Sequence, residues 1–99
     1  MPNTSTPVIA NGRKSSIGNS AVQITATASL CRMGITFKAP LTNTDKVWLG
    51  GSGITCDAAD STDGFPLEIG ETVTISVDSP HLVYARSPTA GQKVFWVGS

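Results

Sequence analysis

The sequence predicts an all-β fold, either an antiparallel β-sandwich or a jelly-roll-like barrel, with an extended N-terminal arm. Short segments in which apolar and polar residues alternate recur along most of the chain, which is the pattern of half-buried strands. Turn signals separate these segments at intervals of roughly 8–12 residues, and no window of useful length has a helical period. The 99 residues suffice for one domain, which we expect to span residues 21–99.

The first 20 residues are rich in Ser, Thr, Asn, Gly and Pro and contain one short apolar patch, Pro-Val-Ile-Ala at residues 7–10. We expect residues 1–20 to form an arm with little structure of its own. One interpretation is a disordered tail. The other is an extended arm that docks Val8 and Ile9 on a neighbouring subunit, since disordered segments often become ordered on binding.

From residue 21 onward the alternation is regular enough to place strands. The clearest one has Val73, Ile75 and Val77 alternating with Thr, Ser and Asp. Residues 57–64 form a polar loop, after which residues 65–67 return to the interior. The expected strands cover residues 22–28, 35–39, 46–49 with a resumption at 54–55, 72–78, 82–85 and 93–97.

Composition narrows the classes of function. Charged side chains make up 14% of the sequence, against about 25% in ordinary globular proteins, and such a surface suits a protein that is covered by partners. The zero net charge gives no sign of nucleic-acid binding. No apolar run approaches the ~18 residues of a membrane span. The amino terminus lacks the features of a signal peptide, so we expect the protein to stay where it is made unless an assembly carries it out.

Residues able to carry catalysis are scarce. His81 is the only histidine, and a catalytic base needs a positioned partner. The glycine-rich segment at residues 50–53 lacks the spacing of a serine nucleophile elbow and the lysine of a phosphate-binding loop, so it is better interpreted as a turn. The sequence therefore predicts a protein that is not an enzyme and holds no cofactor.

Two further groups have alternative interpretations. Asp57, Asp60 and Asp63 lie three residues apart, whereas an EF-type calcium loop has ligands at every second residue and closes with a glutamate. A solvated acidic turn is therefore favoured over a calcium site. Cys31 and Cys56 match no metal or redox spacing. Two reduced, buried thiols are favoured over a disulfide formed in an oxidising medium.

Phe95 and Trp96 are neighbours in the last expected strand, so their side chains must point to opposite faces. One aromatic ring then lies on the outer face. It serves a subunit contact, a sugar-stacking platform, or a core closed on both sides by the N-terminal arm. Subunit contact is favoured because Val94 and Val97 leave few polar groups in this strand for sugar hydroxyls.

Three motifs follow one another in a fixed order. Residues 43–50 are Asn-Thr-Asp-Lys-Val-Trp-Leu-Gly, residues 64–71 are Gly-Phe-Pro-Leu-Glu-Ile-Gly-Glu, and residues 82–85 are Leu-Val-Tyr-Ala. In this order the chain resembles, over roughly residues 20–97, small β proteins encoded among the virion genes of tailed bacteriophages and prophages. The group includes capsid decoration (cement) proteins and modules at the base of head spikes or tail spikes.

The resemblance implies a β-sandwich or jelly-roll module that adheres to a symmetric particle, often as a homotrimer. We expect a decoration protein, assembled in the host cytoplasm, that binds the major capsid protein of the finished head and stabilises the virion by mass action. A tail, baseplate or spike-base adaptor is the alternative within this class, and a carbohydrate-binding adhesion module is the alternative from another class. The residues expected to contact the shell or other subunits are Val8, Ile9, Arg13, Lys14, Phe95 and Trp96.

Overall fold

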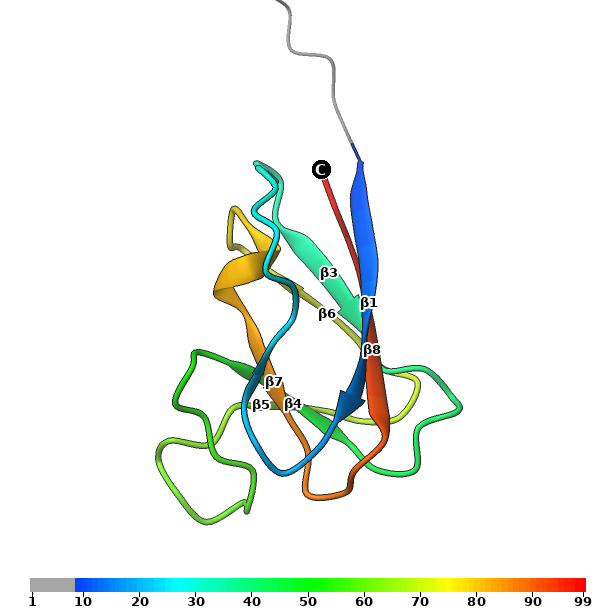
Figure 1. Cartoon of the computed structure of the whole chain (residues 1–99), viewed down its shortest axis with the longest axis vertical. Helices are drawn as coiled ribbons and strands as arrows, with labels where there is room; N and C mark the ends of the chain where they lie inside the picture. The colour runs from blue at the N-terminus through cyan, green and yellow to red at the C-terminus, as the bar shows by residue number, and fades with distance from the viewer. Residues whose placement is uncertain (1–8) are drawn as a thin grey trace, which may run out of the picture.

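The computed structural model describes residues 9–99, which form an antiparallel β-sandwich (Figure 1). Its elements are β1 (Ala10–Ile17), β2 (Val22–Gln23), β3 (Ile35–Lys38), β4 (Val47–Gly50), β5 (Phe65–Leu67), β6 (Thr72–Ile75), a 3₁₀ turn η1 (Pro80–Leu82), β7 (Tyr84–Arg86) and β8 (Gln92–Gly98). Within these described residues the chain has no α-helix. The predicted all-β class and sandwich architecture are therefore confirmed.

The strands divide into two four-stranded sheets, with orders β1-β8-β3-β6 and β2-β7-β4-β5. The antiparallel strand pairs are nested in the sequence, each pair enclosed by the next. The innermost pair is β4 with β5, followed by β3 with β6, β2 with β7 and β1 with β8. This is one long hairpin whose strand pairs are rolled alternately into two facing sheets, the arrangement of a jelly roll. Both ends of the described chain consequently lie in the same sheet, next to each other.

The core lies between the sheets and follows the period of two. In β8, the residues Gln92, Val94, Trp96 and Gly98 are buried, and the residues between them are more exposed. β3 alternates in the same way, with Ile35 and Phe37 fully buried. These side chains pack against Val47, Leu49, Leu67, Val83 and Ala85 of the opposite sheet and its flanks.

The expected arm over residues 1–20 is wrong for Ala10–Ile17, which form β1 and pair with β8. β1 lacks the alternation of apolar and polar residues by which the other strands are recognised, because the residues at its inward positions are small or polar. A Cβ added to Gly12 would lie 2.9 Å from the indole of Trp96, so the aromatic ring of the neighbouring strand fills the space under β1. A register shift between Lys14 and Ile17, with Ser16 at φ 59°, ends the regular pairing.

A second buried group lies on the outer side of the β2-β7-β4-β5 sheet. Val47 and Leu49 point into the main core, so Trp48 between them points outward, yet it is only 6% exposed. Arg86, opposite Trp48 in the register, donates to the Ile54 carbonyl at 3.0 Å and so holds the segment after β4 against this face. Ile54 and Cys56 of that segment are also buried but outside the main core.

Several strands are shorter than expected, and the one expected over residues 72–78 ends at Ile75. The strand expected over residues 22–28 is reduced to β2, because Ala26 and Ala28 are exposed and offer little apolar surface to bury. The strand expected at residues 82–85 begins later, at Tyr84, because Pro80 starts the turn η1. The N–H of Val83, the residue after this turn, donates to the Pro80 carbonyl.

Candidate functional site

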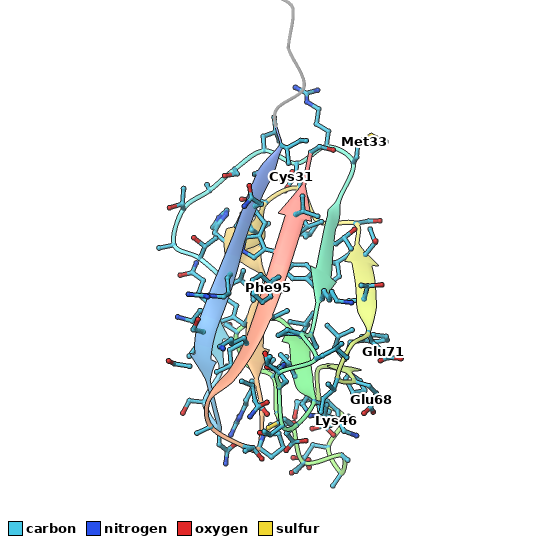
Figure 2. The ribbon with its side chains drawn as sticks, turned by 90° about the vertical axis from the view of Figure 1, so that its right-hand side faces the viewer. Cys31, Met33, Lys46, Glu68, Glu71 and Phe95 are labelled. Carbon is cyan, nitrogen blue, oxygen red and sulfur yellow. The ribbon has the colours of Figure 1, made fainter. Side chains whose placement is uncertain are left out.

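The outer face of the β1-β8-β3-β6 sheet is the candidate site. Two rows of outward side chains cross all four strands. One row runs Arg13, Phe95, Lys38, Thr72, and the next runs Asn11, Val97, Thr36, Thr74. We call these eight residues the docking face. Figure 2 shows Phe95 projecting from the ribbon of β8 toward the viewer, near the middle of the sheet.

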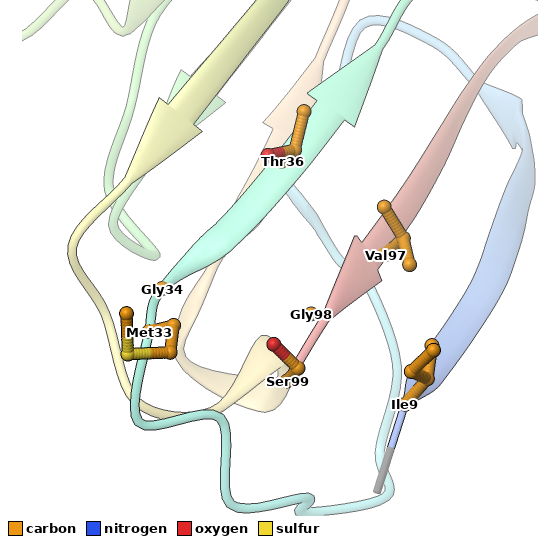
Figure 3. Close-up of a pocket in the computed structure, with 7 residues that line it drawn as sticks. All are labelled: Ile9, Met33, Gly34, Thr36, Val97, Gly98 and Ser99. Atoms are coloured by element: carbon orange, nitrogen blue, oxygen red, sulfur yellow. The ribbon is translucent and has the colours of Figure 1, made fainter. Parts of the chain in front are cut away.

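The centre of the docking face is apolar. Phe95 is 42% and Val97 46% exposed, and both lie on β8, flanked by neighbouring strands on either side. A hollow of about 330 Å³ beside them is lined mainly by apolar surface and reaches Asn11 and Thr72 at its margins. At the end of the sheet, Ile9 and Met33 border a second hollow of about 240 Å³ together with Val97 (Figure 3).

The charges of the docking face are all positive. Every acidic residue of the chain lies in the connections between strands, whereas the charged residues within β1, β3, β6 and β8 are Arg13, Lys14, Lys38 and Lys93. The zero net charge therefore conceals a basic sheet and acidic loops. Arg13 places its guanidinium carbon 6.0 Å from the centroid of the Phe95 ring, within cation–π range. The face thus combines an apolar centre with a basic and hydroxyl-rich margin.

Three of the residues expected from the sequence come together here: Ile9, Arg13 and Phe95 share the same side of the sheet. Lys14 is opposite Val94 of the core and so belongs to the inner side of β1. Trp96 is 8% exposed and its side chain packs in the core, so it contributes to this surface only as part of the lining of the larger hollow. Val8 lies outside the described residues.

Sequence reasoning missed Thr36, Lys38, Met33 and the threonines of β6 as members of the same surface. The alternation in residues 35–39 already marks Thr36 and Lys38 as outward-facing. What it does not contain is the pairing of β3 with β8, which joins residues about sixty positions apart. The common face therefore becomes visible only in the fold.

The acidic loop is organised by its own hydrogen bonds. Asp63 accepts hydrogen bonds from the Thr55 hydroxyl at 2.7 Å and from the backbone N–H groups of Asp57 and Asp60. The Thr55 hydrogen bond is the main reason that the pKa of Asp63 is below its ordinary value. The pKa of Asp60 is raised by its hydrogen bond to Asp57 and by that neighbour's negative charge. Over residues 9–99, no cluster of His, Cys, Asp and Glu could hold a metal ion.

Ser79 and His81 form a pair that sequence reasoning did not single out. The Ser79 Oγ lies 2.6 Å from His81 Nδ1 and also accepts a hydrogen bond from the Ser29 N–H. Ser79 is 7% exposed, and neither hollow of the docking face reaches it. This geometry fastens the segment before β3 to the start of η1.

Both cysteines are buried free thiols, as the sequence favoured. Cys31 belongs to the main core and Cys56 to the group around Trp48, so they lie in different buried environments. Burial raises the pKa of the Cys56 thiol above its ordinary value.

Comparison with known proteins returned no matching family model, no matching curated protein and no matching solved structure. Among the residues described, no helix combines the length and the hydropathy of a membrane-crossing segment. The function must therefore be argued from the sequence motifs, the fold and the docking face.

Proposed function

We propose that this protein is a structural component of a bacteriophage particle, a decoration protein that binds the assembled capsid through the docking face. The observation that carries this proposal is the pair Phe95 and Val97, exposed at the centre of a four-stranded sheet and surrounded by Arg13, Lys38 and threonines. An apolar centre with a polar margin is the usual anatomy of a protein–protein interface.

Two further observations support the same class. The order of the motifs resembles that of virion proteins of tailed phages, and jelly rolls recur in viral capsid domains. Fold alone does not define function, and the docking face is the feature that favours binding to a protein partner. A partner that contributes acidic side chains around an apolar centre would complement the basic margin, with the charges favouring correct orientation.

Stabilisation of the head follows from mass action. A protein that binds only the assembled shell lowers the free energy of that state relative to the dissociated subunits. It needs no catalytic group and no enclosed pocket. It needs a rigid surface, and the docking face is built on strands whose inward residues Phe37, Val94 and Trp96 are fixed in the core.

The experiment compares particles assembled with wild-type protein and with the double variant Phe95→Ser, Val97→Ser. The copies of this chain per particle are counted by quantitative gel analysis and cryo-electron microscopy. We expect at least a tenfold loss of occupancy and dissociation of heads at lower temperature. Phe65→Ser is the matched control, because Phe65 is 56% exposed but lies on β5 of the other sheet. Unchanged occupancy of the double variant would contradict the proposal.

Counting the copies of this chain on the same particles distinguishes a decoration protein from a tail component. A decoration protein is present in numbers that scale with the capsomers, whereas a tail, baseplate or spike-base adaptor scales with the single tail. A carbohydrate-binding module requires ordered polar groups beside its aromatic ring, and the hollow beside Phe95 is mainly apolar. Binding of the purified protein to a glycan array, lost in the double variant, would replace the capsid proposal with adhesion.

A further inference from the structure

The sandwich has four edge strands: β1 and β6 in one sheet, β2 and β5 in the other. Open edges pair with other chains unless something blocks them. β1 is blocked by its register shift near Ser16 and carries two cations. β2 has only two residues, and the middle residue of β5 is Pro66, which has no N–H to donate.

β6 lacks these features. Its sequence, Thr-Val-Thr-Ile, contains no charge and no proline, and its pairing with β3 is regular along all four residues. All four residues are β-branched, the type that favours strands. Val73 and Ile75 face the core side but are only partly buried, because in the part of the chain that the structure describes no strand pairs with the far side of β6. Figure 2 shows β6, drawn in yellow, at the margin of the sheet.

The hydrogen-bond pattern identifies the backbone groups that point outward from β6. The Ala39 N–H donates to the Glu71 carbonyl at 3.1 Å, one step beyond the Lys38–Thr72 pair. Hydrogen-bonded and non-hydrogen-bonded pairs alternate along an antiparallel ladder. Thr36 and Thr74 therefore form a non-hydrogen-bonded pair, which agrees with the 2.8 Å between their hydroxyls. The N–H and C=O groups of Thr72 and Thr74 then face away from β3.

We propose that two copies of this chain pair edge to edge through β6, antiparallel, about a two-fold axis at Val73, which makes a dimer rather than the homotrimer that the resemblance implies. Thr72 of each copy lies opposite Thr74 of the other, so that both free N–H groups and both free carbonyls of each strand are hydrogen-bonded. The two Val73 side chains cover each other on the core side. The two sheets β1-β8-β3-β6 become one continuous sheet, with an isologous contact of the kind that two-fold dimers use.

The chemistry of the edge favours a second copy over another partner. The two-fold operation places threonine against threonine and valine against valine, which are favourable cross-strand pairs. It also sets Glu71 opposite Ile75 of the second copy, so within residues 71–75 no like charges lie opposite each other. An edge without charges offers nothing to select an acidic or basic peptide. Because the axis is perpendicular to the sheet, the docking faces of both copies point the same way.

The test measures the mass of the purified full chain by sedimentation equilibrium over a concentration series. We expect a monomer–dimer equilibrium, with slower amide hydrogen exchange at Thr72 and Thr74 as the dimer forms. Thr74→Pro removes an outward N–H but no backbone hydrogen bond to β3, and should raise the dimer Kd at least tenfold; like its control, it also removes the hydroxyl contact with Thr36. Thr74→Val is the matched control, because it removes the same hydroxyl and keeps the N–H, and it should dimerise like the wild type.

Circular dichroism establishes whether each variant is folded. If Thr74→Pro does not fold, Val73→Lys is a second variant that should be monomeric, because it sets two cations opposite each other across the two-fold axis. A wild-type protein that stays monomeric throughout the series would overturn the proposal. So would a dimer or trimer that persists in Thr74→Pro and Val73→Lys, or one whose exchange protection maps to other strands. Since this inference does not depend on capsid binding, particle occupancy of the double docking-face variant tests the proposed function separately.

Discussion

Arg13 and Phe95 lie opposite each other on β1 and β8, with the guanidinium carbon 6.0 Å from the ring centroid. The contact joins residues from the two ends of the chain on the exposed side of one sheet. Directly beneath it, Gly12 and Trp96 form the corresponding pair on the buried side. Of two neighbouring residues in these strands, one therefore contributes to the exposed face and the other to the packing of the core.

Phe95 and Trp96 should differ sharply in their effect on stability. Trp96→Ala removes a buried ring from the core and should lower the free energy of unfolding by about 3–5 kcal/mol. Phe95→Ala removes a half-exposed ring and its contact with Arg13, which should cost no more than about 1 kcal/mol. Urea denaturation followed by circular dichroism measures both. Equal losses in the two variants would contradict the assignment of faces.

Gly12 should not tolerate a side chain. A Cβ at this position would lie 2.9 Å from the Trp96 ring, so Gly12→Ala must displace the indole. We expect a loss of about 1–3 kcal/mol in unfolding free energy, the usual range for overpacking. Gly51→Ala is the control, because a Cβ there meets no atom within 4 Å. A Gly12→Ala variant as stable as Gly51→Ala would show that Trp96 does not fill the space under β1.

Gln92 is a fully buried amide whose hydrogen bonds hold the turn before β4. Its Oε1 accepts from the N–H groups of Thr44 and Asp45, and its Nε2 donates to the Thr44 hydroxyl and the Ala90 carbonyl. Gln92→Met keeps the approximate shape of the side chain but removes these hydrogen bonds. It should lower the free energy of unfolding by about 1–3 kcal/mol for each buried group left without a partner.

Gln23→Met is the comparison for this prediction, since the Gln23 side chain makes one hydrogen bond, to the His81 carbonyl. Thermal unfolding should show a clearly lower Tm for Gln92→Met than for Gln23→Met. Similar Tm values for the two variants would mean that the Gln92 network contributes no more than a single part-buried hydrogen bond.

The acidic loop should give stability a pH dependence with opposite signs at two carboxylates. The lowered pKa of Asp63 means that its contribution is present above the unfolded-state pKa and is lost as pH falls through the folded-state pKa. The raised pKa of Asp60 means that its ionised form disfavours folding, a cost that protonation removes. Asp63→Asn should therefore lower Tm at neutral pH, with the difference from wild type shrinking below about pH 4.

Asp60→Asn is the internal control, because it relieves the repulsion from Asp57 and should raise Tm at neutral pH. Thermal unfolding across a pH series separates the two variants. If both substitutions shift Tm in the same direction at neutral pH, the hydrogen-bond assignment at Asp63 is wrong.

The sequence predicts those features that depend on the two-residue alternation of side chains along a single strand. The alternation in residues 93–97 places Phe95 and Trp96 on opposite faces, and the structure confirms this with Phe95 exposed and Trp96 buried. It could not predict β1, because the small Gly12 carries no apolar signal and its packing partner, Trp96, is more than eighty residues away. The sequence indicated a resumed strand at Ile54 and a buried Cys56 thiol. It did not indicate that both lie outside the main core, because they stand in a segment rich in Gly and Asp, without alternation.

The candidate site was predicted only in part for the same physical reason. Ile9, Arg13 and Phe95 were each selected, but their common surface arises from pairings between distant strands. Lys38 and Thr36 enter the face through β3, which the sequence describes as a strand without naming its neighbours. Long-range pairing is the information that single-sequence patterns lack.

The burial of Trp48 away from the main core has a practical consequence. The chain contains two tryptophans, and they stand in separate buried groups on opposite sides of one sheet. Each is therefore an intrinsic fluorophore for its own region. With Trp48→Phe and Trp96→Phe as single-emitter variants, intensity changes during unfolding would reveal whether the segment covering Trp48 detaches before the sandwich opens or together with it.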